Sequence, residues 1–362
     1  MIKNTFRVRD LLKTNSERGA LKDHAKRLHK ESIVVDTHSD TILELWLHPG
    51  VDFSKRNEEV FDMDLPRLME GGVTCQMMAI CNADSPASVA LRRPERAVSL
   101  PRMRKGDNLL GLSAALDCIE LVYREIEKSP DKLTLARKAE DVRKAKEEGK
   151  VALMMSTESR LPSGATLDTL RILHRLGLRC VALSGYENRK SDTIGGPLDP
   201  FAFDLIDEMG RLGMLVDVSH LLEEGFWQVA KAAKGPFIDT HGNAYSLCPH
   251  PRNLKDDQLK ALAEAGGVIG VMSYKPFIDA QAPSLSRLLD HIDYIVGLVG
   301  IDYVGLGMDF DGMGGAKTNA VLKDVADMPL ITEGLLERGY SKREVKKILG
   351  ENYMRVFDAV LR

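Results

Sequence analysis

The fold class can be predicted from residues 214–241, MLVDVSHLLEEGFWQVAKAAKGPFIDTH. It begins with a short apolar run, Met214–Val218, and continues with Leu222–Ala233, whose apolar residues recur at helical spacing. A second apolar run, Pro236–Asp239, follows directly. A strand followed by an amphipathic helix predicts one βα unit, and the second apolar run is the strand of the next unit. The two strands are expected to be parallel.

The same alternation continues in both directions along the chain. Six further strands are expected at Ile33–Val35, Val73–Ala79, Val151–Met155, Cys180–Leu183, Gly267–Met272 and Tyr303–Gly307. Further helical segments are expected at Leu167–Leu176, Asp257–Ala265, Leu288–Val299 and Ser341–Leu361. Eight βα units in one chain predict an α/β protein with a closed (β/α)8 TIM barrel. The active site of such a barrel lies at the C-terminal ends of the strands.

The length of the chain allows one elaborated barrel. We expect residues 1–362 to form a single domain, with a helical extension at about residues 1–32 and an insertion at about residues 80–150. Within the insertion, Ala114–Lys128 has helical periodicity, whereas Leu91–Lys105 combines arginines with prolines and predicts a basic loop. That loop is either a solvated surface or a lid that steers anions.

Composition and charge exclude several classes of partner. The net charge of −3 and the pI near 6.3 provide no basic surface for a nucleic acid. No apolar run is long enough to cross a bilayer, and no secretion signal is visible near Met1. The five cysteines are scattered, which is typical of reduced thiols. The sequence therefore predicts a soluble cytoplasmic protein with a small-molecule partner and no membrane partner.

Four of the expected strands end in residues that can bind a metal ion. The first strand leads into His38 and Asp40, which lie on the same face of an extended backbone. Other strands lead into Glu158, His220 and His241. A single histidine after a strand is more often structural, but four strand ends at one rim of a barrel indicate a metal site. The other histidines lack this context and are expected to be structural.

Five ligands exceed the three that a single catalytic zinc ion takes from protein, so the sequence predicts two divalent metal ions, with Zn²⁺ expected. Glu158 is the natural bridging ligand, with His38 and Asp40 completing one ion and His220 and His241 the other. A water between the ions would lose its proton near neutral pH, and the resulting hydroxide would be the nucleophile. Glu158 is therefore expected to serve catalysis as well as metal binding.

Two further residues are candidates for chemistry and for substrate binding. Asp309 stands at the end of the last strand, in Gly305–Gly312 (GLGMDFDG), and is expected to transfer protons. The glycines of this stretch allow close approach of the backbone, and Asp311 is expected to form a turn. Arg252 follows the His241 strand and offers a planar fork for a substrate carboxylate, although a lone arginine is more often a surface residue.

Together these residues resemble the membrane (renal-type) dipeptidase family of zinc peptidases, specifically its soluble bacterial branch. The matching stretches are Asp36–Asp40, Asp64–Gly72 (DLPRLMEGG), Glu158, Asp217–His220, His241, Cys248–Leu254 (CPHPRNL), Gly305–Gly312 and Gly350–Phe357 (GENYMRVF). The resemblance implies a metal-dependent hydrolase barrel, a dipeptide-like substrate and a homodimer. It also implies metal binding by the five ligands named above, carboxylate binding by Arg252 and an acid/base role for Asp309.

Two positions depart from the family pattern. The family usually has glycines directly after the bridging glutamate, where this chain has Ser159-Arg160. The fourth strand of the family normally ends in Leu-Thr-His, whose histidine contacts the substrate, whereas this chain has Leu183-Ser184-Gly185. Tyr186, or a residue among 187–189, is the candidate to contact the substrate instead. Without such a substitute, the loss of one donor predicts a rate about 10²–10³ lower on ordinary dipeptides.

Three hypotheses of function follow. The first is hydrolysis of the amide bond of a dipeptide or a dipeptide-like substrate. The second is another metal-dependent amidohydrolase activity on the same scaffold, acting on an N-acyl amino acid, a lactam or a small ester, which Gly185 and the Leu91–Lys105 loop would favour. The third is a metal-bearing protein without catalytic activity. A hydrolysis screen with enzyme of known metal content separates the three.

Overall fold

A computed structural model describes residues 15–80, 111–187, 196–312 and 320–362. Its strands are β1 (Val35–Asp36), β2 (Cys75–Ala79), β3 (Leu133–Leu135), β4 (Val151–Ser156), β5 (Leu178–Ala182), β6 (Leu215–Asp217), β7 (Asp239–Gly242), β8 (Ile269–Val271) and β9 (Val304–Leu306). Each of the eight strands expected from the sequence overlaps one of these. The Leu91–Lys105 loop and positions 188–189 lie outside the described residues.

The strands form a parallel barrel. The order in the sheet is β6-β5-β4-β2-β1-β9-β8-β7, and β3 pairs with the first half of β4. The two ends of this path meet where Asp217 of β6 bridges Ile238, directly before β7. The Ile238 amide donates to Val216 O at 2.9 Å, and the Val218 amide donates to Ile238 O at 2.8 Å. The predicted (β/α)8 barrel is confirmed, and its strands follow one another around the barrel in chain order.

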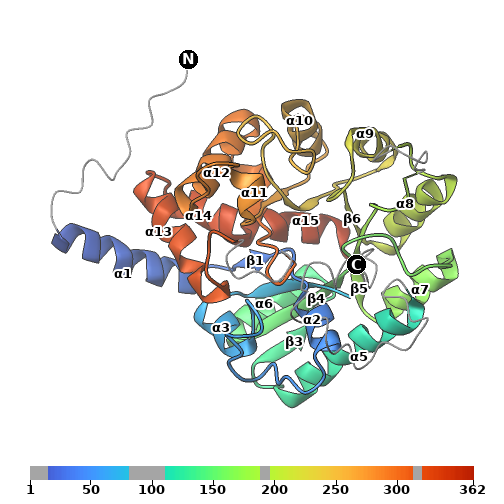
Figure 1. The fold of residues 1–362 in the computed structure, drawn as a ribbon, viewed down its shortest axis with the longest axis horizontal. Helices are drawn as coiled ribbons and strands as arrows, with labels where there is room; N and C mark the ends of the chain where they lie inside the picture. The colour runs from blue at the N-terminus through green and yellow to red at the C-terminus, as the bar shows by residue number, and fades with distance from the viewer. Residues whose placement is uncertain (1–14, 81–110, 188–195, 313–319) are drawn as a thin grey trace.

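Helices lie outside the strands (Figure 1). They are α1 (Asn15–Glu31), α2 (Thr41–Leu47), α3 (Leu65–Glu70), α5 (Leu112–Lys128), α6 (Ala139–Glu148), α7 (Leu167–Arg175), α8 (Pro200–Leu212), α9 (Glu223–Ala232), α10 (Asp256–Glu264), α11 (Lys275–Ile278), α12 (Leu285–Val299), α13 (Pro329–Glu337), α14 (Lys342–Lys346) and α15 (Asn352–Val360). None of the helices in the described segments is long and apolar enough to span a bilayer.

Helix α8 shows how the sequence sets the helix ends. Asp199 caps its N-terminus, because the carboxylate accepts a hydrogen bond from the Ala202 amide at 2.9 Å. Pro200 occupies the first helical position, where no amide hydrogen is needed. Gly213 ends the helix in the left-handed conformation, with φ of 71°, and the chain then enters β6. These local signals fix where α8 begins and ends and therefore where the chain enters β6.

Alternate residues of β4 pack into two different cores. Ala152 and Met154 belong to a core with Tyr353 and Phe357 of α15, whereas Leu153 belongs to the larger core shared with the surrounding helices. This division follows from the two-residue period of a strand, whose successive side chains point to opposite faces. The side chains on one face of β4 therefore point into the barrel interior, and those on the other face pack against the surrounding helices.

Two features of the fold differ from the sequence prediction. Strand β3 was not expected, because Leu133–Leu135 is too short to show a strand period. The residues assigned to β7 begin at Asp239 rather than at Pro236. Ile238 nevertheless pairs with β6, so the apolar run before β7 takes part in closing the barrel.

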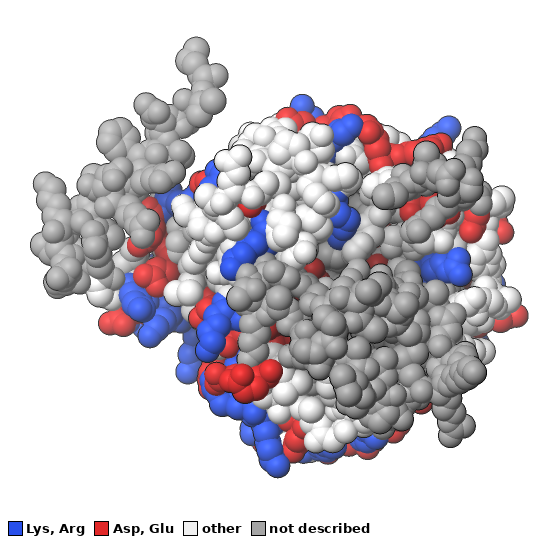
Figure 2. All heavy atoms as spheres, in the orientation of Figure 1, with Lys and Arg blue, Asp and Glu red and all other residues white. Residues whose placement is uncertain are grey.

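Charged residues on the face drawn in Figure 2 are mixed in sign. Among the described residues of this face, lysines and arginines lie beside aspartates and glutamates around the edge. Exposed charged residues of the described segments form ion pairs, for example Arg56 with Glu70 at 2.7 Å. Such exposed pairs contribute little to stability, on the order of 0–1 kcal/mol each.

Candidate metal centre

The ends of five strands, β1, β4, β6, β7 and β9, bring six ionisable side chains together. Their ligand atoms form three groups, within each of which all atoms lie within 4.8 Å of one another. The groups are His38 with Asp40 and Glu158, Glu158 with His220 and His241, and His38 with His241 and Asp309. The first two groups correspond to the two ligand sets predicted from the sequence, and Glu158 belongs to both.

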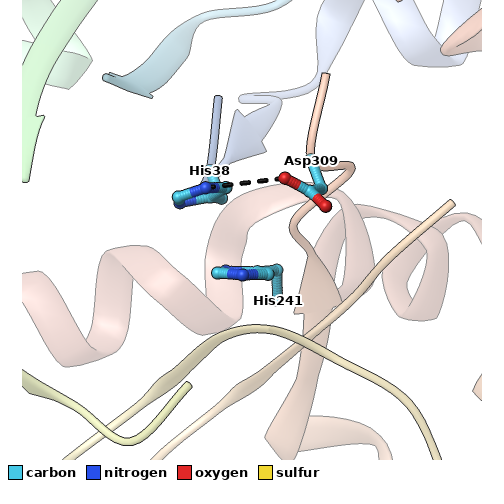
Figure 3. Close-up of side chains that lie close together, drawn as sticks. All are labelled: His38, His241 and Asp309. Carbon is cyan, nitrogen blue, oxygen red and sulfur yellow. Dashed lines mark ion pairs between the residues drawn. The ribbon is translucent and has the colours of Figure 1, made fainter. Parts of the chain in front are cut away.

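The histidine rings of β1 and β7 stack at the centre of this cluster (Figure 3). The His38 and His241 ring centroids are 3.9 Å apart, and the ring planes differ by 22°. Asp309 approaches from the end of β9, where its Oδ1 lies 3.5 Å from His38 Nε2. His38 Nε2 is buried and makes no hydrogen bond with any described residue. A buried nitrogen in this position suits a metal ligand.

A second group of ligand atoms comes from the histidines at the ends of β6 and β7. His220 Nε2 and His241 Nε2 are 2.8 Å apart, and Glu158 Oε1 lies 3.2 Å from His220 Nε2. Two imidazole nitrogens and a carboxylate oxygen therefore point to one position. Nitrogen and oxygen donors in this combination fit Zn²⁺ and similar divalent cations.

Hydrogen bonds beneath His241 fix the orientation of its ring. Thr240 Oγ1 donates to Asp217 Oδ2 at 2.6 Å and lies 3.0 Å from His241 Nδ1. Because the single hydroxyl proton goes to Asp217, Thr240 Oγ1 can only accept from His241, which then carries its proton on Nδ1. The Nε2 lone pair is left facing His220 and Glu158, as metal binding requires.

The same network ties β6 to β7. Ser219 Oγ donates to Asp239 Oδ1 at 2.5 Å, and the amides of Ser219 and Thr240 both donate to Asp217 Oδ1. Burial raises the pKa of Asp217, and it raises that of Asp239 to about 7. This network was not expected from the sequence, although an aspartate precedes each histidine, in Asp217–His220 and in Asp239–His241.

Strained backbone marks the rim of the site. His220, Asp309 and Asp311 have positive φ values of 66°, 64° and 65°. Non-glycine residues in this conformation cost about 1–3 kcal/mol and cluster at functional sites. A side chain at Gly312 would collide with Asp309 Oδ1 and would lie 2.7 Å from Asp40 Oδ2. The glycine predicted to allow close approach thus borders both carboxylates.

Burial favours the neutral form of two histidines of the cluster, His38 and His241. Burial lowers the pKa of His38 to about 4, although the Glu158 carboxylate opposes that shift. Burial also lowers the pKa of His241 well below its usual value. Neutral imidazole is the form that binds a metal ion. The buried donor set, its neutral histidines and its converging nitrogens therefore fit divalent cations.

The two residues predicted to bind substrate lie in different environments. Arg252 is half-buried, and burial lowers its pKa, while the carboxylates of Asp239, Asp309 and Glu158 oppose that shift. It therefore shares the electrostatic environment of the metal-ligand candidates. Tyr186 is 6% exposed, and its hydroxyl accepts a hydrogen bond from the Leu161 amide at 3.2 Å.

The other described histidines lie apart from these groups. His29 of α1 contacts Gly71 O and Thr332 Oγ1, both at 2.7 Å, and thereby joins three helical segments. His291 Nε2 lies 2.9 Å from Ile278 O. These contacts are the structural roles expected for histidines away from the strand ends.

Asp311 holds the turn after β9, as expected from the sequence. Its carboxylate accepts hydrogen bonds from Thr41 Oγ1 and from the Asp62 amide.

Comparisons with known proteins agree with this geometry. The dipeptidase tcpJ of Claviceps purpurea is 35% identical over 252 residues, which are 67% of this chain and 59% of that protein. The dipeptidase verJ of Clonostachys rogersoniana is 29% identical over 354 residues, covering 93% of this chain and 86% of that protein. Among solved structures, a metallopeptidase of Rhodobacter sphaeroides liganded with a phosphinate mimic of the dipeptide L-Ala-D-Ala is 27% identical. It matches with a TM-score of 0.77 over 91% of this chain and 99% of that one.

The family model for membrane dipeptidases, peptidase family M19, matches residues 22–362. This match covers the whole barrel and every residue of the candidate site. The chain therefore belongs to the membrane dipeptidase family.

Proposed function

We propose that this protein is a dipeptidase that uses two divalent metal ions, Zn²⁺ in the native enzyme, to hydrolyse the amide bond of a dipeptide. The observation that carries the proposal is the pair of ligand groups that share Glu158. Family membership and the dipeptidases among the relatives support the same activity. The ligand N and O atoms come from strand ends, where TIM-barrel enzymes place their chemistry.

Each ligand group would hold one ion. His38 and Asp40 would bind the first, His220 and His241 the second, and the Glu158 carboxylate would bridge them. When bound, the ions would supply a hydroxide at neutral pH and polarise the scissile carbonyl. Thr240 and Asp217 would hold the His241 ring in the required orientation through the hydrogen bonds described above.

Two further residues would transfer protons and bind the substrate. Asp309 lies beside His38 and would accept the proton of the attacking water and return it to the leaving amine. Arg252 would bind the free carboxylate of the dipeptide with its planar guanidinium. That contact would place the scissile bond over the metal ions and would disfavour substrates that lack the carboxylate.

A hydrolysis screen tests the proposal. Enzyme of measured metal content is offered L,L- and L,D-dipeptides together with N-acyl amino acids, lactams and small esters. We expect turnover of dipeptides that is lost on chelation and restored by adding a divalent metal. Turnover confined to acylated substrates, lactams or esters would support the second hypothesis, an amidohydrolase with a reshaped pocket. Metal binding without any turnover would support the noncatalytic hypothesis.

A further inference from the structure

The C-terminal motif Gly350–Phe357 matches the family pattern, yet it supplies none of the metal-ligand candidates. It lies at the N-terminal ends of the strands, because the Asn352 side-chain amide donates to Ile301 O and to Val304 O, both at 2.7 Å, and Val304 begins β9. The next residue, Tyr353, is fully buried in the core of the barrel interior. The motif therefore places a tyrosine inside the barrel, from the end opposite the metal-ligand candidates.

The Tyr353 hydroxyl ends beside that of Thr37, the residue after β1. The two oxygens are 3.1 Å apart, and Thr37 Oγ1 also lies 2.7 Å from Thr240 O and 3.0 Å from Leu306 O. The Tyr353 hydroxyl is 3.4 Å from Asp239 O. Thr37 has one hydroxyl proton, so when it donates to Thr240 O, Tyr353 can donate to Thr37. These two side chains, called the hydroxyl pair below, link β1, β7 and β9 inside the barrel.

Glycines of β8 and β9 leave room for the hydroxyl pair. A Cβ atom on Gly270 would lie 2.8 Å from the Tyr353 hydroxyl, and one on Gly307 would lie 2.9 Å from Thr37 Oγ1. A Cβ atom on Gly305 would collide with the Tyr353 ring. These distances are too short for non-bonded atoms, so larger residues would displace the pair. The close approach that the sequence predicts for the glycines of the last strand thus admits the tyrosine from the C-terminal motif.

The hydroxyl pair is linked to the chain one residue before His38, one residue before His241 and three residues before Asp309. These three side chains form one ligand group and come from the ends of β1, β7 and β9 (Figure 3). Functional groups must be held within about 0.5 Å of their working positions. We propose that the hydroxyl pair, Thr37 with Tyr353, sets the distances among these three side chains and thereby governs metal affinity and proton transfer. Both are positioning residues that act through the backbone, and the inference rests on the proposed two-metal function.

Removal of single hydroxyl groups tests the proposal. Zn²⁺ affinity is measured by calorimetric titration of metal-free protein, and kcat and KM for a dipeptide at saturating metal, in wild type, Tyr353→Phe, Thr37→Val and Thr37→Ser. Tyr353→Phe keeps the ring that fills the barrel interior. We expect it and Thr37→Val each to weaken Zn²⁺ binding and to lower kcat roughly 10-fold, the lower end of the range typical of groups that orient metal ligands, with KM little changed. Thr37→Ser, which retains the hydroxyl, should recover most of the loss.

A double variant and a matched control separate positioning from stability. Tyr353→Phe combined with Thr37→Val should lose less than the product of the two single effects, because both remove the same contact. In Tyr340→Phe, a half-buried tyrosine loses a hydroxyl that donates to Asp293 at 2.9 Å, and Zn²⁺ affinity and kcat should not change. Denaturant unfolding measures the stability of each variant.

Two results would be decisive against the inference or against the function on which it rests. If Tyr353→Phe and Thr37→Val lower stability but keep the wild-type Zn²⁺ affinity and kcat, the hydroxyl pair only supports the fold, and the inference is wrong while the dipeptidase proposal stands. If wild type loaded with Zn²⁺ hydrolyses no dipeptide, the proposed function is wrong, and the Zn²⁺ titrations alone still decide whether the pair positions the ligands.

Discussion

Two regions of the rim are built in different ways. The ligand arc, formed by the ends of β1, β6, β7 and β9, is held by buried side-chain hydrogen bonds such as the one from Thr240 to Asp217. The β4–β5 corner, residues 158–161 and 184–187, is held by hydrogen bonds that have a backbone group on at least one side, such as those from the Arg160 amide to Ser184 O and from the Leu161 amide to the Tyr186 hydroxyl. The arc matches the family pattern, and the corner departs from it. Glu158 is the residue through which the corner joins the arc, because it belongs to two of the ligand groups.

The largest expected effect comes from the residue where the two regions meet. Glu158→Gln should remove the carboxylate that both ligand groups share, so bound metal should fall from about two ions per chain to less than one. Asp40→Asn is the matched control, because it touches one group only and should spare the other ion. Metal analysis after dialysis measures both variants. Equal metal loss in the two variants would contradict the bridging role of Glu158.

A smaller effect is expected at Arg252, which faces the arc from the segment after β7. Arg252→Lys keeps the charge but loses the planar fork, so kcat/KM for free dipeptides should fall by roughly 10- to 100-fold, which is about 1.5–3 kcal/mol. Dipeptide amides, which lack the carboxylate, should be affected much less. A fall of the same size with free and amidated substrates would show that Arg252 does not bind the carboxylate.

Disrupting the hydrogen-bond network beneath the arc should have an effect similar to or smaller than that of the Arg252 substitution. Thr240→Val removes the hydroxyl that accepts from His241 Nδ1, and metal affinity should fall about 10- to 100-fold, as is typical of groups that orient a ligand. Thr240→Ser retains the hydroxyl and should remain near wild type. Calorimetric titration of the metal-free protein with Zn²⁺ measures the change. Unchanged affinity in Thr240→Val would show that the arc does not depend on this network.

The smallest effect concerns a buried histidine outside both regions. Burial lowers the pKa of His29 to about 4, so between pH 6.5 and 4 the unfolded chain binds a proton that the folded chain does not. Stability should therefore fall as pH decreases through this window, by about 1 kcal/mol at pH 5.5. In His29→Gln this part of the pH dependence should vanish, as denaturant unfolding at several pH values can measure. A pH profile identical to that of wild type would contradict the shift.

The arc could be predicted from the sequence, and the corner could not. Buried parallel strands appear as short apolar runs, and the rule that barrel chemistry lies at the strand ends then groups His38, His220 and His241 of the arc with Glu158, the one corner residue that this rule finds. The contact between Arg160 and Gly185 depends on how two separate loops lie on each other, which no local pattern encodes. The left-handed conformation of His220 is likewise imposed by tertiary structure. The sequence identifies Arg160 and Gly185 as departures from the family pattern, but only the fold shows that these two residues are in contact.

The ligand arc and Glu158 are proposed to hold two catalytic ions together. The direct test is to add Zn²⁺ stepwise to metal-free protein and to follow dipeptide hydrolysis together with bound metal. Activity should rise with metal and reach its plateau at about two ions per chain. Full activity at one ion per chain, or hydrolysis that persists in metal-free protein, would contradict this proposal.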